Sequence, residues 1–154
     1  TGCSTSKMVT HDRIARLEFG SCLDMLEPVQ AVTALVGRLV GLDEDALHWV
    51  NVAVRESVIN AVQHGNQNDR RKSVCIEFLS SMNNGSAELT VLVRDEGQGF
   101  DPSELADPLS PENLLRPHGR GVFLIRSLMD EVVLQRMPEG GMEVRMVKRA
   151  PPIG

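Results

Sequence analysis

The spacing of hydrophobic residues divides the chain into short stretches of two kinds. In the first kind, apolar and polar residues alternate, as they do in a strand with one buried face. Asn83-Asn84-Gly85 separates two such stretches and is typical of a hairpin turn, and Pro138-Glu139-Gly140-Gly141 separates two others. We therefore predict two hairpins and one further strand near the N-terminus. The predicted strands cover residues 13–19, 73–79, 87–94, 131–136 and 142–148.

In the second kind, apolar residues repeat with the period of an α-helix. Pro28 suits the start of the first helix, and Gly41 suits its end. Asp43 is a good N-cap for the second helix, and Gly65 is a predicted C-cap glycine. This second helix is apolar on most of its circumference, which predicts burial on several sides. The predicted helices cover residues 28–41, 44–64 and 121–129.

Strands and helices occur in blocks, which predicts an α+β fold, a two-layer sandwich. The two hairpins make at least part of the sheet antiparallel. A length of 154 residues predicts a single domain over residues 1–154, with residues 1–10 disordered. Residues 96–118 are rich in Gly, Pro, Asp and Ser, and so long a connection predicts a functional lid.

Composition narrows the classes of partner. The chain has 21 acidic and 16 basic side chains and a formal net charge of -5, which argues against a nucleic-acid or membrane surface. No apolar run is long enough to span a bilayer. Cys3, Cys22 and Cys75 lack the spacing of a zinc site, so they indicate free thiols in a reducing cytoplasm.

Two polar residues stand out in the apolar second helix. Glu56 and Asn60 lie one turn apart and therefore on the same face, and His64 continues their line. A buried carboxylate without a partner is costly, so this face either opens on a cavity or is a solvated polar stripe. If it opens on a cavity, the amide and carboxylate oxygens can hold Mg²⁺ or activate a hydroxyl group.

Two glycine-containing loops add further candidate chemistry. Asp95 ends a predicted strand and is followed by Gly97 and Gly99, so the backbone there can approach a ligand closely, although such turns are also common without any function. Gly119-Arg120-Gly121 directly precedes a predicted helix, where free N–H groups can bind an anion. The same glycines can also serve only a tight turn.

The order of these motifs resembles one family. A helix with E-x-x-x-N, a strand ending in D-x-G-x-G, a long lid and then G-x-G at a helix make up the pattern of the Bergerat-fold (GHKL) ATPases. Within them the chain is similar to the small anti-sigma-factor serine kinases. The resemblance extends from Ile14 to Val147. It implies a mixed, mostly antiparallel sheet covered on one face by helices.

The resemblance also implies a role for each matching residue. Asn60 would hold the Mg²⁺ that bridges the ATP phosphates, Glu56 would act as general base, and Asp95 would accept a hydrogen bond from the adenine amine. The remaining nucleotide-binding positions shape the adenine pocket or cradle the phosphates. They are Gly97, Gly99, Arg116, Gly119, Arg120, Gly121 and Val122.

The sequence departs from the family pattern at two positions. Pro117 stands where the family often has a basic residue that reaches a phosphate, so this contact would pass to Arg116 or Arg120. Met142 stands where the family commonly has a hydroxyl side chain beside the adenine. Both changes bear on the strength of nucleotide binding.

The function implied by the resemblance is that of a protein serine/threonine kinase that phosphorylates a STAS-type anti-sigma-factor antagonist. A sigma factor is a possible second partner, and relatives of this size usually form homodimers. One alternative is a non-catalytic module in which nucleotide only gates protein binding. Another is the ATPase domain of a histidine kinase, although the chain has no dimerisation helix pair bearing a phospho-acceptor histidine.

Overall fold

The computed structural model describes residues 11–98 and 117–151, and of residues 117–120 only the backbone. The predicted disordered segment 1–10, most of the predicted lid, Gly99 and Arg116 lie outside the described residues. The described elements, in chain order, are β1 (Asp12–Gly20), a short 3-10 turn (Leu23–Met25), α1 (Leu26–Val40), α2 (Glu44–Asn60), a π-helical turn (Ala61–Gly65), β2 (Ser73–Asn83), β3 (Ser86–Arg94), α3 (Pro117–Leu128), β4 (Glu131–Arg136) and β5 (Met142–Arg149).

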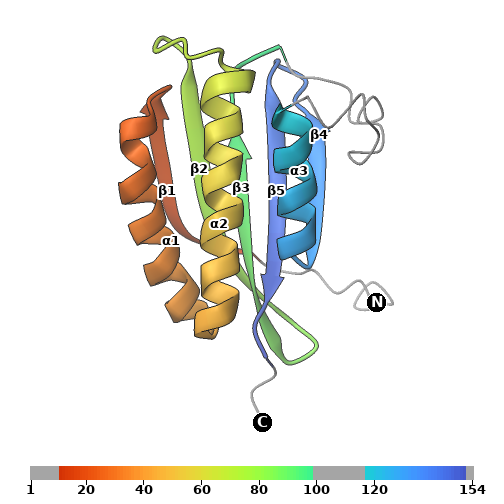
Figure 1. Cartoon of the computed structure of the whole chain (residues 1–154). Helices are drawn as coiled ribbons and strands as arrows, with labels where there is room; N and C mark the ends of the chain where they lie inside the picture. Colours follow the sequence, from red (N-terminus) through yellow and green to blue (C-terminus); the bar gives the residue numbers. More distant parts are fainter. Residues whose placement is uncertain (1–10, 99–116, 152–154) are drawn as a thin grey trace, which may run out of the picture.

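The strands form one sheet in the order β1-β2-β3-β5-β4, and each neighbouring pair is antiparallel. All three α-helices cover the same face of this sheet, with α2 between α1 and α3 (Figure 1). The predicted α+β two-layer sandwich is therefore confirmed. Among the described residues the sheet contains no parallel pair, so the implied mixed sheet is not found. Two helices, α1 and α2, lie between β1 and β2 in the chain and return it antiparallel, and β5 lies between β3 and β4, the strands that α3 connects.

Both predicted hairpins are present. Asn84 and Gly85 form the tight turn between β2 and β3, with φ of 53° and 80°, the left-handed conformation that such turns need. Gly140 and Gly141 lie in the second turn with φ of 102° and 91°. The first strand of the first hairpin continues to Asn83, beyond its predicted end, because its pairing with β3 extends to the turn itself.

The core lies between the two layers. Val74, Ile76 and Phe78 of β2 point toward the helices at a spacing of two, and all three are fully buried. Val50, Val54 and Val58 of α2 face them at helical spacing and are also fully buried. Burying each such side chain stabilises the fold by about 1.5–3 kcal/mol, so α2 is fixed firmly on the sheet.

Helix α2 follows most of the prediction. The Asp43 side chain accepts a hydrogen bond from the backbone N–H of Ala46 at 2.8 Å and so caps its start. The helix is buried against the sheet and the two flanking helices, but its outward side is exposed, with Trp49 43% exposed. The helical segment ends at Gly65, as predicted, but the prediction that Gly65 is a C-cap glycine is wrong, because Gly65 has no positive φ and is the last residue of the π-helical turn.

Helix α3 begins earlier than predicted, at Pro117 rather than Gly121. Proline fits the first turn of a helix, since that turn uses no N–H of its own. Gly119, Arg120 and Gly121 therefore lie inside the first turns of α3 and not in a loop before it. No helix among the described residues is long and apolar enough to cross a membrane.

The face of the sheet opposite the helices carries a row of ion pairs. Glu77 of β2 is only 7% exposed and pairs with Arg13 of β1 at 2.9 Å and with Arg94 of β3. Arg94 also pairs with Glu143 of β5 at 2.6 Å. Burial alone would raise the pKa of Glu77, but the hydrogen bonds and charges of Arg94 and Arg13 outweigh it and hold that pKa below its usual value.

The lowered pKa of Glu77 predicts a pH effect on stability. Because the folded pKa lies below the unfolded one, this pair stabilises the protein above the ordinary glutamate pKa, and the stabilisation is lost as the pH falls through the folded pKa. Glu77→Gln should therefore lower the free energy of unfolding at pH 7 and flatten its decline in acid. Urea denaturation between pH 7 and pH 3 measures both changes.

Glu18→Gln is the matched control, because Glu18 pairs with Arg16 at 3.1 Å on the surface of the neighbouring strand with half of each side chain exposed. An exposed pair of this kind contributes little. Equal pH profiles for the two variants would contradict the role assigned to Glu77.

Candidate functional site

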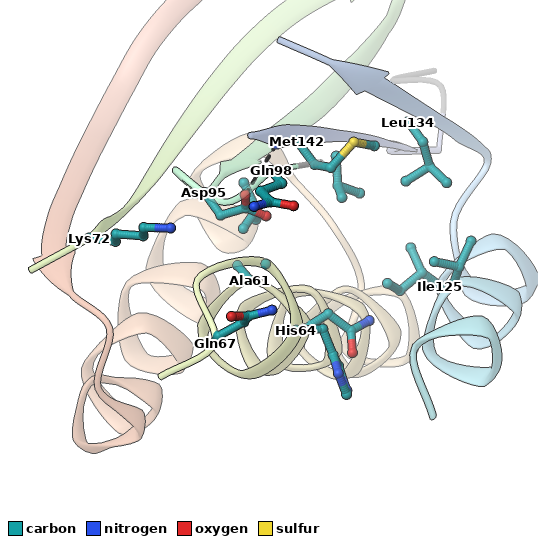
Figure 2. A pocket seen from close by; sticks show the side chains of 14 residues that line it. Ala61, His64, Gln67, Lys72, Asp95, Gln98, Ile125, Leu134 and Met142 are labelled. Carbon is teal, nitrogen blue, oxygen red and sulfur yellow. Dashed lines mark hydrogen bonds between the residues drawn. The ribbon is translucent and has the colours of Figure 1, made fainter. Parts of the chain in front are cut away.

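A cavity of about 250 Å³ opens between the helical layer and the sheet, where α2 ends. Its walls come from the π-helical turn after α2, from α3 and from the ends of β3 and β5 (Figure 2). Its apolar lining consists of Ala61, Val93, Val122, Ile125, Leu134, Met142 and Val144. The polar side chains on its other walls come from the motif at the end of α2, from the motif after β3 and from the loop before β2.

Asp95 is the carboxylate of this cavity. It directly follows β3, and its Oδ1 accepts hydrogen bonds from the backbone N–H groups of Gly97 at 2.9 Å and Met142 at 3.2 Å. These two bonds fix the carboxylate in one orientation. The described residues provide no donor for Oδ2, which leaves one oxygen available to a ligand with an N–H group.

Burial raises the pKa of Asp95 above its usual value, and the N–H groups of Gly97 and Met142 and the charge of Lys72 offset this only in part. The cause is desolvation, which disfavours the charged form. A partly desolvated carboxylate gains more from a new hydrogen-bond donor than an exposed one does. The position therefore favours a ligand that brings an amine to Oδ2.

Two glycines allow the backbone to close around Asp95. A Cβ atom on Gly65 would overlap the Asp95 carboxylate, and one on Gly97 would overlap the carbonyl oxygen of Gly65. The end of the helical layer and the loop after β3 thus touch through bare backbone. This contact is the reason for a glycine at position 65, in place of the predicted C-cap role.

Asn60 lies on the opposite side of the cavity, at the end of α2. A Cβ on Gly121 would come within 2.5 Å of its Nδ2, so the glycine lets α3 pack directly against the Asn60 amide. Val122, the next residue, also lines the cavity. The backbone N–H groups of Gly119 and Arg120 belong to the first turn of α3, where helix N–H groups have no partner within the helix.

These features fit a nucleotide with a cation. Asn60 offers one amide oxygen, and the start of α3 offers N–H groups and the positive end of the helix dipole to phosphates. Among the described residues no three His, Cys, Asp or Glu side chains form a metal cluster. A cation here would have to share its oxygen ligands with phosphate and water, as Mg²⁺ commonly does.

Glu56 is not part of the cavity lining. It lies one turn before Asn60 on the same side of α2 and is half-buried. The structure therefore brings Asn60, Asp95, Gly97, Gly121 and Val122 together, and leaves Glu56 beside the Asn60 end of the site. His64 lines the cavity but is largely exposed.

Asn66, which belongs to none of the predicted motifs, is fully buried. Its Nδ2 donates to Ser21 Oγ at 2.9 Å and to the Ser73 carbonyl at 3.0 Å, and its Oδ1 accepts from the Glu96 N–H at 2.8 Å. One amide thus links the end of the helical layer to β2 and to the residue after Asp95. Asparagine is so common in loops that its presence at position 66 does not by itself indicate a special role.

Lys72 and Gln98 also line the cavity and were not predicted. Lys72 lies outside the motifs, in the loop before β2, and Gln98 is the variable residue between Gly97 and Gly99 of the second motif. Only the closure of the sheet against the end of α2 brings them to the same space.

Comparison with known proteins is consistent with this geometry. The family model described as a histidine kinase-like ATPase domain matches residues 21–148. Serine-protein kinase RsbW of Bacillus subtilis (strain 168) is 34% identical over 121 residues, which cover 73% of this chain and 71% of the relative. Serine-protein kinase RsbW of Staphylococcus epidermidis is 32% identical over 117 residues, which cover 70% and 69%.

A solved structure supports the fold. The crystal structure of the RsbU and RsbW domains of Rv1364c from Mycobacterium tuberculosis aligns with a TM-score of 0.61 and 17% identity, covering 90% of this chain and 34% of that chain. With the family model matched over most of the sequence and relatives above 30% identity, the chain belongs to the histidine kinase-like (GHKL) ATPase family, in the branch of the anti-sigma-factor serine-protein kinases.

Proposed function

We propose that the protein is an ATP- and Mg²⁺-dependent serine/threonine kinase that phosphorylates a STAS-type anti-sigma-factor antagonist in a partner-switching system. The observation that carries the proposal is a cavity lined from the sheet by Asp95 and from the helical layer by Asn60 and Val122, with the first turn of α3 directly before Val122. An amine-accepting carboxylate opposite a phosphate-binding helix start matches the two ends of ATP. The names of the relatives support protein phosphorylation as the use of that ATP.

In this proposal each residue has one task. Asp95 Oδ2 accepts a hydrogen bond from the adenine amine, while its Oδ1 is held by Gly97 and Met142. Asn60 is the residue that would hold Mg²⁺, which when bound neutralises charge on the phosphates. The backbone N–H groups at the start of α3, including those of Gly119 and Arg120, bind phosphate oxygens.

Glu56 is the proposed general base. It accepts the proton of a serine or threonine hydroxyl of the antagonist as that oxygen bonds to the γ-phosphorus and the bond from phosphorus to the β–γ bridging oxygen breaks. Glu56 lies one turn before Asn60 on α2, which in this proposal is nearer to the phosphates than to the adenine. A half-buried carboxylate outside the cavity can meet a hydroxyl group that arrives from another protein.

The same position favours a second candidate function. Because Glu56 does not line the cavity, nucleotide could bind without any phosphoryl transfer and serve only to gate protein binding. A sigma factor would be the further partner in either case. The proposal includes a cytoplasmic location, where ATP and the transcription machinery are found.

Replacement of Asp95 tests nucleotide binding. Asp95→Asn keeps the acceptor for Gly97 and Met142 but presents an amide N–H₂ to the adenine amine, so affinity for ATP with Mg²⁺ should fall by roughly 10- to 150-fold. The free energy of unfolding should stay the same or rise, since a desolvated charge is removed. Asp45→Asn, an exposed position in the first turn of α2, is the charge-matched control. Calorimetry that shows equal affinity for both variants would rule out the assignment.

Replacement of Glu56 separates the two functions. Glu56→Gln keeps size and polarity but cannot take a proton, so phosphotransfer should fall by about 10²- to 10⁴-fold while ATP binding stays near normal. Asn60→Ala should lose the Mg²⁺-dependent part of binding as well. Glu44→Gln, exposed at the other end of α2, is the control.

The assay is radiolabel transfer to STAS-type proteins of the native host, run beside ATP titrations. A wild-type rate for Glu56→Gln would exclude the catalytic role. Tight ATP binding by wild type without transfer to any antagonist would favour the gated binding module.

The sheet edge suggests a homodimer. Strand β1 pairs only with β2, so its outer backbone N–H and C=O groups have no strand partner among the described residues. Light scattering in solution should give the mass of two chains across the micromolar range. A mass of one chain that does not change with concentration would contradict the homodimer. In that case the charged side chains of Arg13 and Arg16 would keep the exposed edge from pairing with another chain.

A further inference from the structure

The adenine end of the cavity holds a cation beside its carboxylate. Lys72 lines the cavity and is half-buried, and Figure 2 shows its ammonium group directed toward Asp95. Its backbone is fixed: the N–H donates to Asp69 O at 3.0 Å, and the carbonyl accepts from the N–H and the hydroxyl of Ser21 at 3.0 and 2.8 Å. The side chain therefore extends into the cavity from a firmly held position.

Lys72 has no ion-pair partner among the described residues, although its charge is close enough to Asp95 to lower the pKa of that carboxyl group. No hydrogen bond joins the two side chains. One end of the cavity thus offers an acceptor, Asp95 Oδ2, and beside it a charged donor, Lys72 Nζ. The long, flexible side chain of lysine keeps its ammonium group in contact with water and can turn toward a ligand at little cost in free energy. The donor is therefore available when a nucleobase enters the cavity.

The apolar wall cannot provide this donor. The backbone N–H of Met142 already donates to Asp95, and its thioether carries no hydrogen to donate. Gln98 is the other polar side chain near Asp95 in Figure 2, but it is exposed and carries no charge. Lys72 is consequently the donor that the described structure places best.

We propose that Lys72 is a base-selecting residue, which donates a hydrogen bond to a ring nitrogen of adenine while Asp95 accepts from the neighbouring amine. This inference rests on the proposed ATP binding. The amine of adenine is flanked by N1 and N7, both acceptors, so an acceptor and a donor side by side match either edge. Guanine has a carbonyl oxygen in place of that amine, and this oxygen would face the Asp95 carboxylate.

The test is a set of titrations with ATP, 1-deaza-ATP and 7-deaza-ATP against wild type and Lys72→Met. Loss of a charged donor should weaken ATP about tenfold or more. One of the two analogues lacks the nitrogen that Lys72 contacts. Wild type should bind this analogue more weakly than it binds ATP, and Lys72→Met should not lower the affinity for it any further. Arg70→Met is the matched control: it removes the same charge from the same loop, but Arg70 is exposed and outside the cavity.

Three results would overturn the inference. If Lys72→Met lowers the affinity for ATP and for both deaza analogues equally, Lys72 acts on the phosphates. If Lys72→Met lowers the affinity for none of them, Lys72 does not contact the nucleotide. An analogue-dependent loss in Gln98→Leu, absent in Lys72→Met, would transfer the role to Gln98. Unfolding curves that coincide for Lys72→Met and wild type exclude a folding defect as the cause.

Failure of the proposed function has a different appearance. If wild type binds no ATP and Asp95→Asn changes nothing, ATP binding itself is wrong and the inference falls with it. If wild type binds ATP and Asp95→Asn weakens it while Lys72→Met does not, only the assignment of Lys72 is wrong.

Discussion

The contact between bare backbone and the Asp95 carboxylate is the constraint on which the rest of the site depends. Gly65 and Gly97 leave out the Cβ atoms that would fill this space, and Gly141 does the same in the turn before β5, where a Cβ would overlap the Asp95 carbonyl. Three segments far apart in the sequence thus meet within van der Waals distance. A side chain at position 65 or 97 would push the end of the helical layer away from the loop after β3 and widen the cavity beside Asp95.

Asn66 keeps those segments in place. Its single buried amide joins Ser21, Ser73 and Glu96, which belong to three separate parts of the sheet region. A buried amide whose donor and acceptor groups are both hydrogen-bonded holds its partners in one arrangement. An apolar residue of the same size would leave those partner groups buried without a hydrogen bond. The π-helical turn before it carries the chain from α2 into this position, and such turns occur often at functional sites.

The site is built at a cost in stability. Desolvation raises the pKa of Asp95, so its ionised form is less stable in the folded protein than in water. The opposite face of the sheet shows the reverse arrangement, since the arginines around Glu77 lower its pKa and favour its charge. One carboxylate is therefore held ready for a ligand, whereas the other is satisfied within the protein. This division matches the exposure of the cavity on one side of the sheet and the self-contained ion pairs on the other.

The sequence by itself determined the elements and the chemistry carried by single residues. Alternation and helical periodicity located all five strands and all three α-helices of the described chain, and the motifs selected Asn60 and Asp95, which both line one cavity. These features could be predicted because strand, helix and turn preferences act between residues a few positions apart.

Only the tertiary structure decided that position 65 needs a glycine and that Asn66 joins separate segments through buried hydrogen bonds. It also decided that Lys72 lines the cavity with Asp95 and that Glu56 lies outside it. Each of these depends on how closely the end of α2 packs on β3 and β5. That distance is set by the summed fit of side chains across the whole core, and no local pattern in the sequence records it.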